Sequence, residues 1–175
     1  IEEGAVLHFE ESLELIPEEC KEPGTTLVVY TPAIPADHKE WELFGNGCFT
    51  VKKRAEVLGL ITKGKMGVCA AGTHGKTTTS TMTAHLLHQS NVGCNAFLGG
   101  ISKNYGTNLL LSDKSEYVVI EADEFDRSFH WLTPYASIIT ATDADHLDIY
   151  GTKEAYLESF NHYTSLIRPG GALIV

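Results

Sequence analysis

The sequence predicts an α/β protein built on a parallel sheet. Short apolar runs alternate with segments of helical spacing along the 175 residues, which is the pattern of strand and helix units in this fold class. Two later runs, at 116–124 and 135–148, contain consecutive apolar residues and end in acids. Strands of this kind are buried on both faces of a parallel sheet, and their carboxyl ends line the ligand crevice.

The first strand and helix are predicted before residue 48. A β-rich run from Leu27 to Thr31 is stopped by Pro32 and Pro35. The segment DHKEWELFGNG that follows predicts a short helix, which ends at Gly45 or Gly47.

A second strand and helix follow, and they lead to a domain boundary. The segment CFTV at 48–51 suits a short strand, and residues 54–62 carry apolar side chains at helical spacing. Because the pattern then restarts, we place a boundary at 63–65. This divides the chain into a first part at 1–64 and a second part at 65–175.

The second part repeats the alternation. Its predicted elements are a strand from Met66, a glycine loop, a helix from about Lys76 to Gln89, a small-residue segment at 95–108, the two acid-ended runs, a helix from about Lys153 to Ile167, and a strand from Ala172.

Composition excludes several classes of protein. The formal charge of −10 provides no broad basic face for nucleic acid, and no apolar run is long enough to span a membrane. The four cysteines are widely separated and form no CxxC pair, which predicts reduced thiols in a cytoplasmic protein. The chain opens without Met and closes on an apolar strand, so we expect a fragment of a longer enzyme.

The segment AAGTHGKTTT at 70–79 predicts a phosphate-binding loop. Gly72 and Gly75 allow the backbone to turn tightly so that N–H groups point at phosphate oxygens, and the following helix adds its positive end. Lys76 can reach the β- and γ-phosphates, and the Thr77 hydroxyl is placed to bind Mg²⁺. Ala70 stands where the general GxxxxGK[ST] pattern has its first glycine, so an ordinary strand-to-helix turn is the alternative.

The rest of the loop is also expected at the nucleotide. Thr73 completes the motif, and Thr78 is placed to touch an α-phosphate. His74 either shapes the backbone or borders the substrate. The threonines at 79, 81 and 83 are interpreted as residues of the helix surface.

The first acid-ended run provides a carboxylate for magnesium. Glu121 is the preferred ligand because it ends a predicted strand and faces Thr77 across the crevice. Asp123 follows it. We interpret Glu124 and Asp126 as members of a solvated charge run.

The second acid-ended run brings Asp143, Asp145, His146 and Asp148 to another strand end. Mg²⁺ prefers oxygen ligands, so a histidine ligand would be unusual. The place of His146 among acids, in a chain with a phosphate loop, nevertheless favours a second divalent cation held there.

Three segments in this order resemble the Mur ligases of peptidoglycan synthesis: GTHGKTT at 72–78, EADE at 121–124 and DADHLDIYG at 143–151. The upstream segments VVYTPAIPADHKEWELF and VKKRAEVLGLI are similar to the N-terminal domain of that family. The resemblance implies the second half of a Rossmann-like, UDP-sugar-binding domain at 1–64. It implies the start of a central parallel-sheet P-loop ATPase domain at 65–175.

The resemblance also implies a reaction. ATP phosphorylates the lactyl carboxylate of UDP-N-acetylmuramate, and the amine of L-alanine attacks the acyl phosphate. Family motifs assign Lys76 and Thr77 to phosphate and a first Mg²⁺, Glu121 to bridging the metals and His146 to a second metal. Lys76, Glu121 and His146 are therefore the expected catalytic residues, and half-domains alone are expected to be inactive.

One more residue is carried over from the family. Asn108 in YGTN resembles the GTNA segment and is expected near the γ-phosphate or the substrate. The chain departs from the family pattern at Phe125, where many members have Ser, and at Leu109, where GTNA has Ala.

Other functions remain open. A recycling ligase that adds a tripeptide to the same UDP-sugar shares the phosphate loop and EADE, and a folate polyglutamate ligase is a more distant relative. A non-catalytic nucleotide-binding module, or a simple P-loop kinase or hydrolase, is a further alternative. The second acid segment with His146 argues against this class, because simple kinases need only one carboxylate segment.

Overall fold

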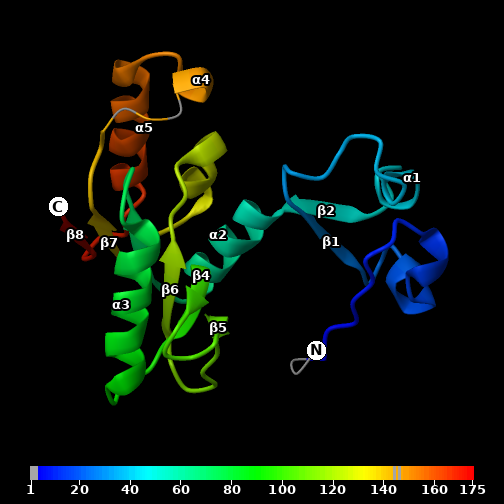
Figure 1. Cartoon of the computed structure of the whole chain (residues 1–175), viewed down its shortest axis with the longest axis horizontal. Helices are drawn as coiled ribbons and strands as arrows, with labels where there is room; N and C mark the ends of the chain where they lie inside the picture. The colour runs from blue at the N-terminus through cyan, green and yellow to red at the C-terminus, as the bar shows by residue number, and fades with distance from the viewer. Residues whose placement is uncertain (1–3, 144, 146) are drawn as a thin grey trace. The chain divides into compact units, whose positions relative to one another are not determined.

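The computed structural model describes residues 4–143, 145 and 147–175 and divides into two compact units (Figure 1). The first unit extends to Val57 and the second begins at Leu58, so the split falls within helix α2 (Arg54–Gly64). The assignment of 1–64 and 65–175 to two domains of a ligase stays a prediction.

The first unit contains a small parallel β-ribbon and short helices. Strand β1 pairs in parallel with β2, with Leu27 opposite Thr50, as the alternation predicts. The rings of Phe44 and Phe49 meet edge to face at 5.1 Å and are buried with Ile16. The elements are η1 (Leu13–Leu15), η2 (Glu18–Lys21), β1 (Leu27–Tyr30), α1 (Trp41–Phe44) and β2 (Thr50–Lys53).

The second unit is built on one sheet with the strand order β5-β4-β6-β3-β7-β8. Every neighbouring pair is parallel except β4 and β5, so the predicted α/β class is confirmed. The strands are β3 (Met66–Ala71), β4 (Asn95–Ser102), β5 (Thr107–Leu110), β6 (Tyr117–Glu121), β7 (Ala136–Ile139) and β8 (Ala172–Ile174).

In the described part of this unit, four helical segments connect the strands (Figure 1). Helix α3 crosses β3, β4 and β6, and α5 packs with α4 and η3. The Thr152 side chain caps α5 by accepting a hydrogen bond from the backbone N–H of Ala155 at 3.1 Å. The segments are α3 (Lys76–Gln89), η3 (Phe125–Trp131), α4 (Leu147–Tyr150) and α5 (Lys153–Ser165).

The central strands are buried on both faces. Successive side chains of a strand point to opposite faces, and in β6 Val118 and Ile120 join one apolar cluster while Val119 joins another. The first cluster includes Tyr156 and other residues of α5, and the second includes Ala84 of α3. Helices therefore cover both faces, as the consecutive apolar residues of β6 indicate.

Among the residues that the structure describes, none of the helices has the length and apolar character needed to cross a membrane.

The cysteines differ in exposure, and we predict that they differ in reactivity. Burial raises the pKa of the Cys69 thiol to about 12, and Cys94 is also buried with a raised pKa. Because the thiolate is the reactive form, iodoacetamide at pH 8 should modify exposed Cys48 and spare these two. Mass spectrometry of the tryptic peptides measures this. Labelling in urea is the control, and rapid modification of Cys69 in the folded protein would contradict the prediction.

Candidate functional site

Three parallel strands bring their carboxyl ends to one edge of the sheet. Strand β3 lies between β6 and β7, and main-chain hydrogen bonds continue just beyond the strand ends. Ala122 N–H donates to Ala70 O at 2.8 Å, and Thr140 N–H donates to Ala71 O at 3.0 Å. The glycine loop and both acid segments therefore start from the same edge, as the sequence predicts.

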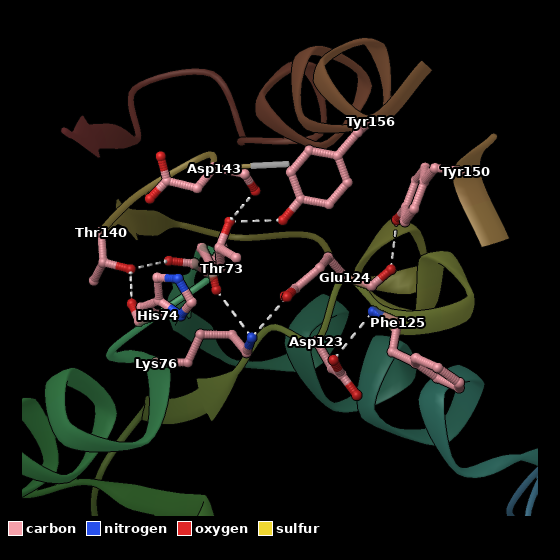
Figure 2. A network of polar contacts seen from close by, with 12 residues as sticks. Thr73, His74, Lys76, Asp123, Glu124, Phe125, Thr140, Asp143, Tyr150 and Tyr156 are labelled. Carbon is pink, nitrogen blue, oxygen red and sulfur yellow. Dashed lines mark hydrogen bonds and ion pairs between the residues drawn. The ribbon is translucent and has the colours of Figure 1, made fainter. Parts of the chain in front are cut away.

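The glycine loop adopts the backbone that its sequence predicts. Gly72 has φ 125° and Gly75 has φ 79°, both in the region that favours glycine. A Cβ on Gly72 would lie 2.3 Å from Thr140 Oγ1, so only hydrogen fits there. The Thr140 hydroxyl also bonds to the carbonyl of His74 (Figure 2), which fastens the loop to the end of β7.

An open pocket of about 360 Å³ lies at the N-terminus of α3. No described side chain caps this helix, so the N–H groups of its first turn are available to an anion. The lining consists of six consecutive loop and helix residues together with Glu121: Thr73, His74, Gly75, Lys76, Thr77, Thr78 and Glu121. The structure thus brings the loop and the first acid segment together.

Two glycines of β4 make room for the pocket residues. A Cβ on Gly99 would lie 2.1 Å from Glu121 Oε2, and a Cβ on Gly100 would lie 3.3 Å from Thr77 Cγ2. Strand β4 is the parallel neighbour of β6. Because Gly99 carries no side chain, the Glu121 carboxylate can occupy the space beside it. In the sequence this pair belongs to a small-residue segment, and no motif predicts a role for it.

Glu121 fits a cation. Its Oε2 atom is buried and accepts no hydrogen bond from the described residues, which is costly for a carboxylate oxygen unless a further group binds it. An oxygen ligand beside a phosphate loop suits Mg²⁺. Within the described residues, no three His, Cys, Asp or Glu side chains converge on one point, so further ligands would be phosphate, water, Thr77 or His146.

Lys76 is held by an ion pair that sequence analysis missed. Its Nζ lies 2.8 Å from Glu124 Oε1 and donates to Gly72 O at 2.9 Å. The side chain of Glu124 is 0% exposed, so its interpretation as part of a solvated charge run is wrong. A buried carboxylate needs a paired cation, and Lys76 provides it. Asp126 is exposed, as that interpretation expects.

Two buried tyrosines join the loop and the acid segments into one polar network (Figure 2). Thr73 donates to the carbonyl of Asp143 at 2.8 Å, so the Tyr156 hydroxyl, also at 2.8 Å, donates to Thr73. Tyr150 donates to the carbonyl of Glu124. Burial raises the pKa of both phenols, which keeps their protons available for these bonds. Tyr150 lies within the DADHLDIYG motif and Tyr156 lies outside every motif, and neither was assigned a role from the sequence.

The remaining predicted residues differ in whether they line the pocket. Thr77 and Thr78 are exposed at the start of α3 and line the pocket, as does exposed His74. Asn108 is exposed on β5, at the edge of the sheet, and is absent from the lining of this pocket. His146 lies outside the described residues. The roles of all these residues stay predictions.

This arrangement is suited to holding a polyphosphate. A helix N-terminus, a fixed ammonium and a carboxylate able to bind a cation surround one open pocket. Such a set stabilises the charge that develops during phosphoryl transfer without any covalent step by the protein.

Comparison with known protein families decides the relationship. The model of the Mur ligase middle domain matches residues 70–175, which is more than half of the chain and contains every pocket residue. This chain belongs to the Mur ligase family. The family expected from the three motifs is thereby confirmed.

Close relatives of this Mur ligase chain carry one name. UDP-N-acetylmuramate–L-alanine ligase of Phocaeicola vulgatus is 75% identical over 175 residues, which cover 100% of this chain and 38% of the relative. The enzyme of the same name from Parabacteroides distasonis is 65% identical over 173 residues, with 99% and 37% covered. The chain therefore spans little more than a third of the length of these relatives.

Solved structures agree with the fold of the Mur ligase chain. The UDP-N-acetylmuramate-alanine ligase of Thermotoga maritima has a TM-score of 0.71 at 31% identity, covering 81% of this chain and 33% of that one. A UDP-N-acetylmuramate:L-alanyl-gamma-D-glutamyl-meso-diaminopimelate ligase from Neisseria has a TM-score of 0.72 at 23% identity, covering 83% and 50%. The second likeness concerns the fold alone.

We predict that Gly72→Ala destabilises the second unit of this Mur ligase. The added Cβ would meet Thr140 Oγ1 at 2.3 Å and would hold a non-glycine residue at φ 125°, so the free energy of unfolding should fall by about 2 to 4 kcal/mol. Urea unfolding followed by circular dichroism measures it. Gly64→Ala is the matched control, because nothing lies within 4 Å of that Cβ. Equal stability of the two variants would refute the steric argument.

Proposed function

We propose that the protein containing this chain is an ATP-dependent ligase that joins L-alanine to the lactyl carboxylate of UDP-N-acetylmuramate through an acyl phosphate. The observation that carries the proposal is the pocket in which Lys76, Thr77 and Glu121 meet at the N-terminus of α3. The name shared by relatives that are 75% and 65% identical supports the choice of substrates. ATP and Mg²⁺ are the proposed cofactors, and we place the reaction in the cytoplasm.

Each pocket residue has a proposed part in the reaction. The loop N–H groups and Lys76 bind and orient the phosphates, so that the γ-phosphoryl group faces the substrate carboxylate. Thr77 and Glu121, with His146 as a further candidate, would hold Mg²⁺. When bound, the metal neutralises phosphate charge. Asn108 remains a candidate for contact with the γ-phosphate or the substrate.

The carboxylate substrate has a proposed place beside the phosphate pocket. A second open pocket of about 520 Å³ shares Thr77 and Thr78 with the first and is otherwise lined by α3, the end of β4 and the turn that follows it. A sugar held there would lie next to the γ-phosphate. The first unit, with a pocket of about 270 Å³ along β1 and α1, is proposed to belong to the UDP-sugar domain.

A tripeptide-adding ligase is the second candidate. The Neisseria structure carries a name of that kind, but its 23% identity argues for the fold alone. The higher identity of the alanine enzymes therefore favours L-alanine as the amine substrate.

We predict that the full-length protein releases phosphate from ATP only when UDP-N-acetylmuramate and L-alanine are both present. The acyl phosphate forms on the sugar and is consumed by the amine, so both are needed for turnover. A coupled phosphate assay measures this. Release without either substrate would refute the ligase proposal in favour of a simple hydrolase, and dependence on the tripeptide instead of L-alanine would favour the recycling ligase.

We predict that Lys76→Ala lowers kcat in this assay roughly 100- to 1,000-fold, because it removes a fixed charge from the transferring phosphoryl group. Lys114→Ala is the control, since Lys114 is an exposed lysine of the same unit outside the pocket. A variant at Lys76 with unaltered turnover would rule out the proposed role.

A further inference from the structure

The Lys76 ammonium lies between two acceptors, and neither acceptor residue lines the pocket. Glu124 Oε1 and Gly72 O lie 2.8 and 2.9 Å from Nζ. Lys76 lines the pocket, whereas Glu124 is fully buried and does not. Figure 2 shows the Glu124 carboxylate pointing at the ammonium from the side of the β6 loop. Glu124 therefore touches Lys76 from inside the protein.

This geometry leaves a donor for a phosphate. An ammonium has three N–H donors, and among the described residues the contacts with Gly72 and Glu124 use two of them. The third is available to an incoming phosphate oxygen in the pocket. Lys76 can thus bind phosphate while it stays paired with Glu124. ATP does not have to break the ion pair in order to bind.

Glu124 is itself held in place by its neighbours. Its carbonyl accepts the hydrogen bond of Tyr150, and the chain turns directly after it through Asp126 and Arg127, whose φ values of 49° and 54° are left-handed. The Arg127 guanidinium lies over the Tyr150 ring, 4.8 Å from its centroid. Because both Glu124 and Arg127 contact Tyr150, the turn is held in place and the carboxylate has a defined position.

We propose that Glu124 is a positioning residue for phosphoryl transfer, which holds the Lys76 ammonium at the pocket wall and acts only through it. A lysine side chain has four rotatable carbon bonds, and ordering it only when ATP arrives would cost entropy during the reaction. Pairing with a buried carboxylate makes that ordering part of the folded state, so the charge is in place for the transition state. The catalytic part of this proposal rests on the proposed function.

The first test compares kcat with KM in the full-length protein. Glu124→Gln keeps the shape of the side chain and removes its charge, and we expect kcat to fall roughly 10- to 100-fold while the KM for ATP changes less than about threefold. Glu116→Gln, which removes an exposed carboxylate of the same unit, should leave both constants unaltered. A Glu124→Gln enzyme with unaltered kcat per folded site, or with only a raised KM, would overturn the proposal.

The second test needs no substrate and separates this proposal from the proposed function. Lys76→Ala leaves the buried carboxylate without this ammonium and should lower the thermal unfolding midpoint by a few degrees. Adding Glu124→Gln to Lys76→Ala should recover part of the loss. Additive losses in the double variant would overturn the pairing. If the wild-type protein shows no substrate-dependent turnover, the proposed ligase function is refuted. The stability of the double variant then still decides whether Lys76 and Glu124 act as a pair.

Discussion

The site depends on the parallel pairing of β6 and β7 with the two sides of β3. Ala70 and Ala71 end β3, and their carbonyls accept hydrogen bonds from the first residues beyond the two neighbouring strands. A buried donor that loses its partner costs about 1 to 3 kcal/mol, so these bonds are hard to break one at a time. Because they lie where the strands end, each of the three loops leaves the sheet from a defined point. This pairing therefore determines the positions of the phosphate loop, Glu121 and Glu124.

The local pattern was sufficient to predict β3, the glycine loop and α3. An apolar run ends at glycines that the backbone requires, and Lys76 to Gln89 forms the predicted helix with the same bounds. Strands β4 and β5 were not predicted as strands. Glycine has low strand propensity, and the Gly99–Gly100 pair interrupts the apolar run of β4. Only the approach of Glu121 and Thr77 from other elements explains that pair.

The residues that line the candidate site were predictable from the sequence, but the buried residues that hold them in place were not. Glu121 ends β6 and lines the pocket with the loop, as its place in the run indicates. Glu124 follows only three residues later, and its burial depends on a turn with two left-handed residues, which no local propensity predicts. Tyr150 and Tyr156 act through hydroxyl contacts with segments that are distant in the sequence. Such contacts depend on tertiary structure alone.

The close fit of β4 against Glu121 limits how this protein can vary in evolution. An alanine at position 99 would place its Cβ 2.1 Å from the Glu121 carboxylate, so it becomes acceptable only if residue 121 shortens or turns away. Position 72 is restricted more strongly, because a side chain there would meet the backbone of Ala141 as well as the Thr140 hydroxyl and would hold φ at 125°. Substitutions at positions 99 and 121 should therefore arise together, whereas position 72 should stay glycine whatever residue occupies position 140.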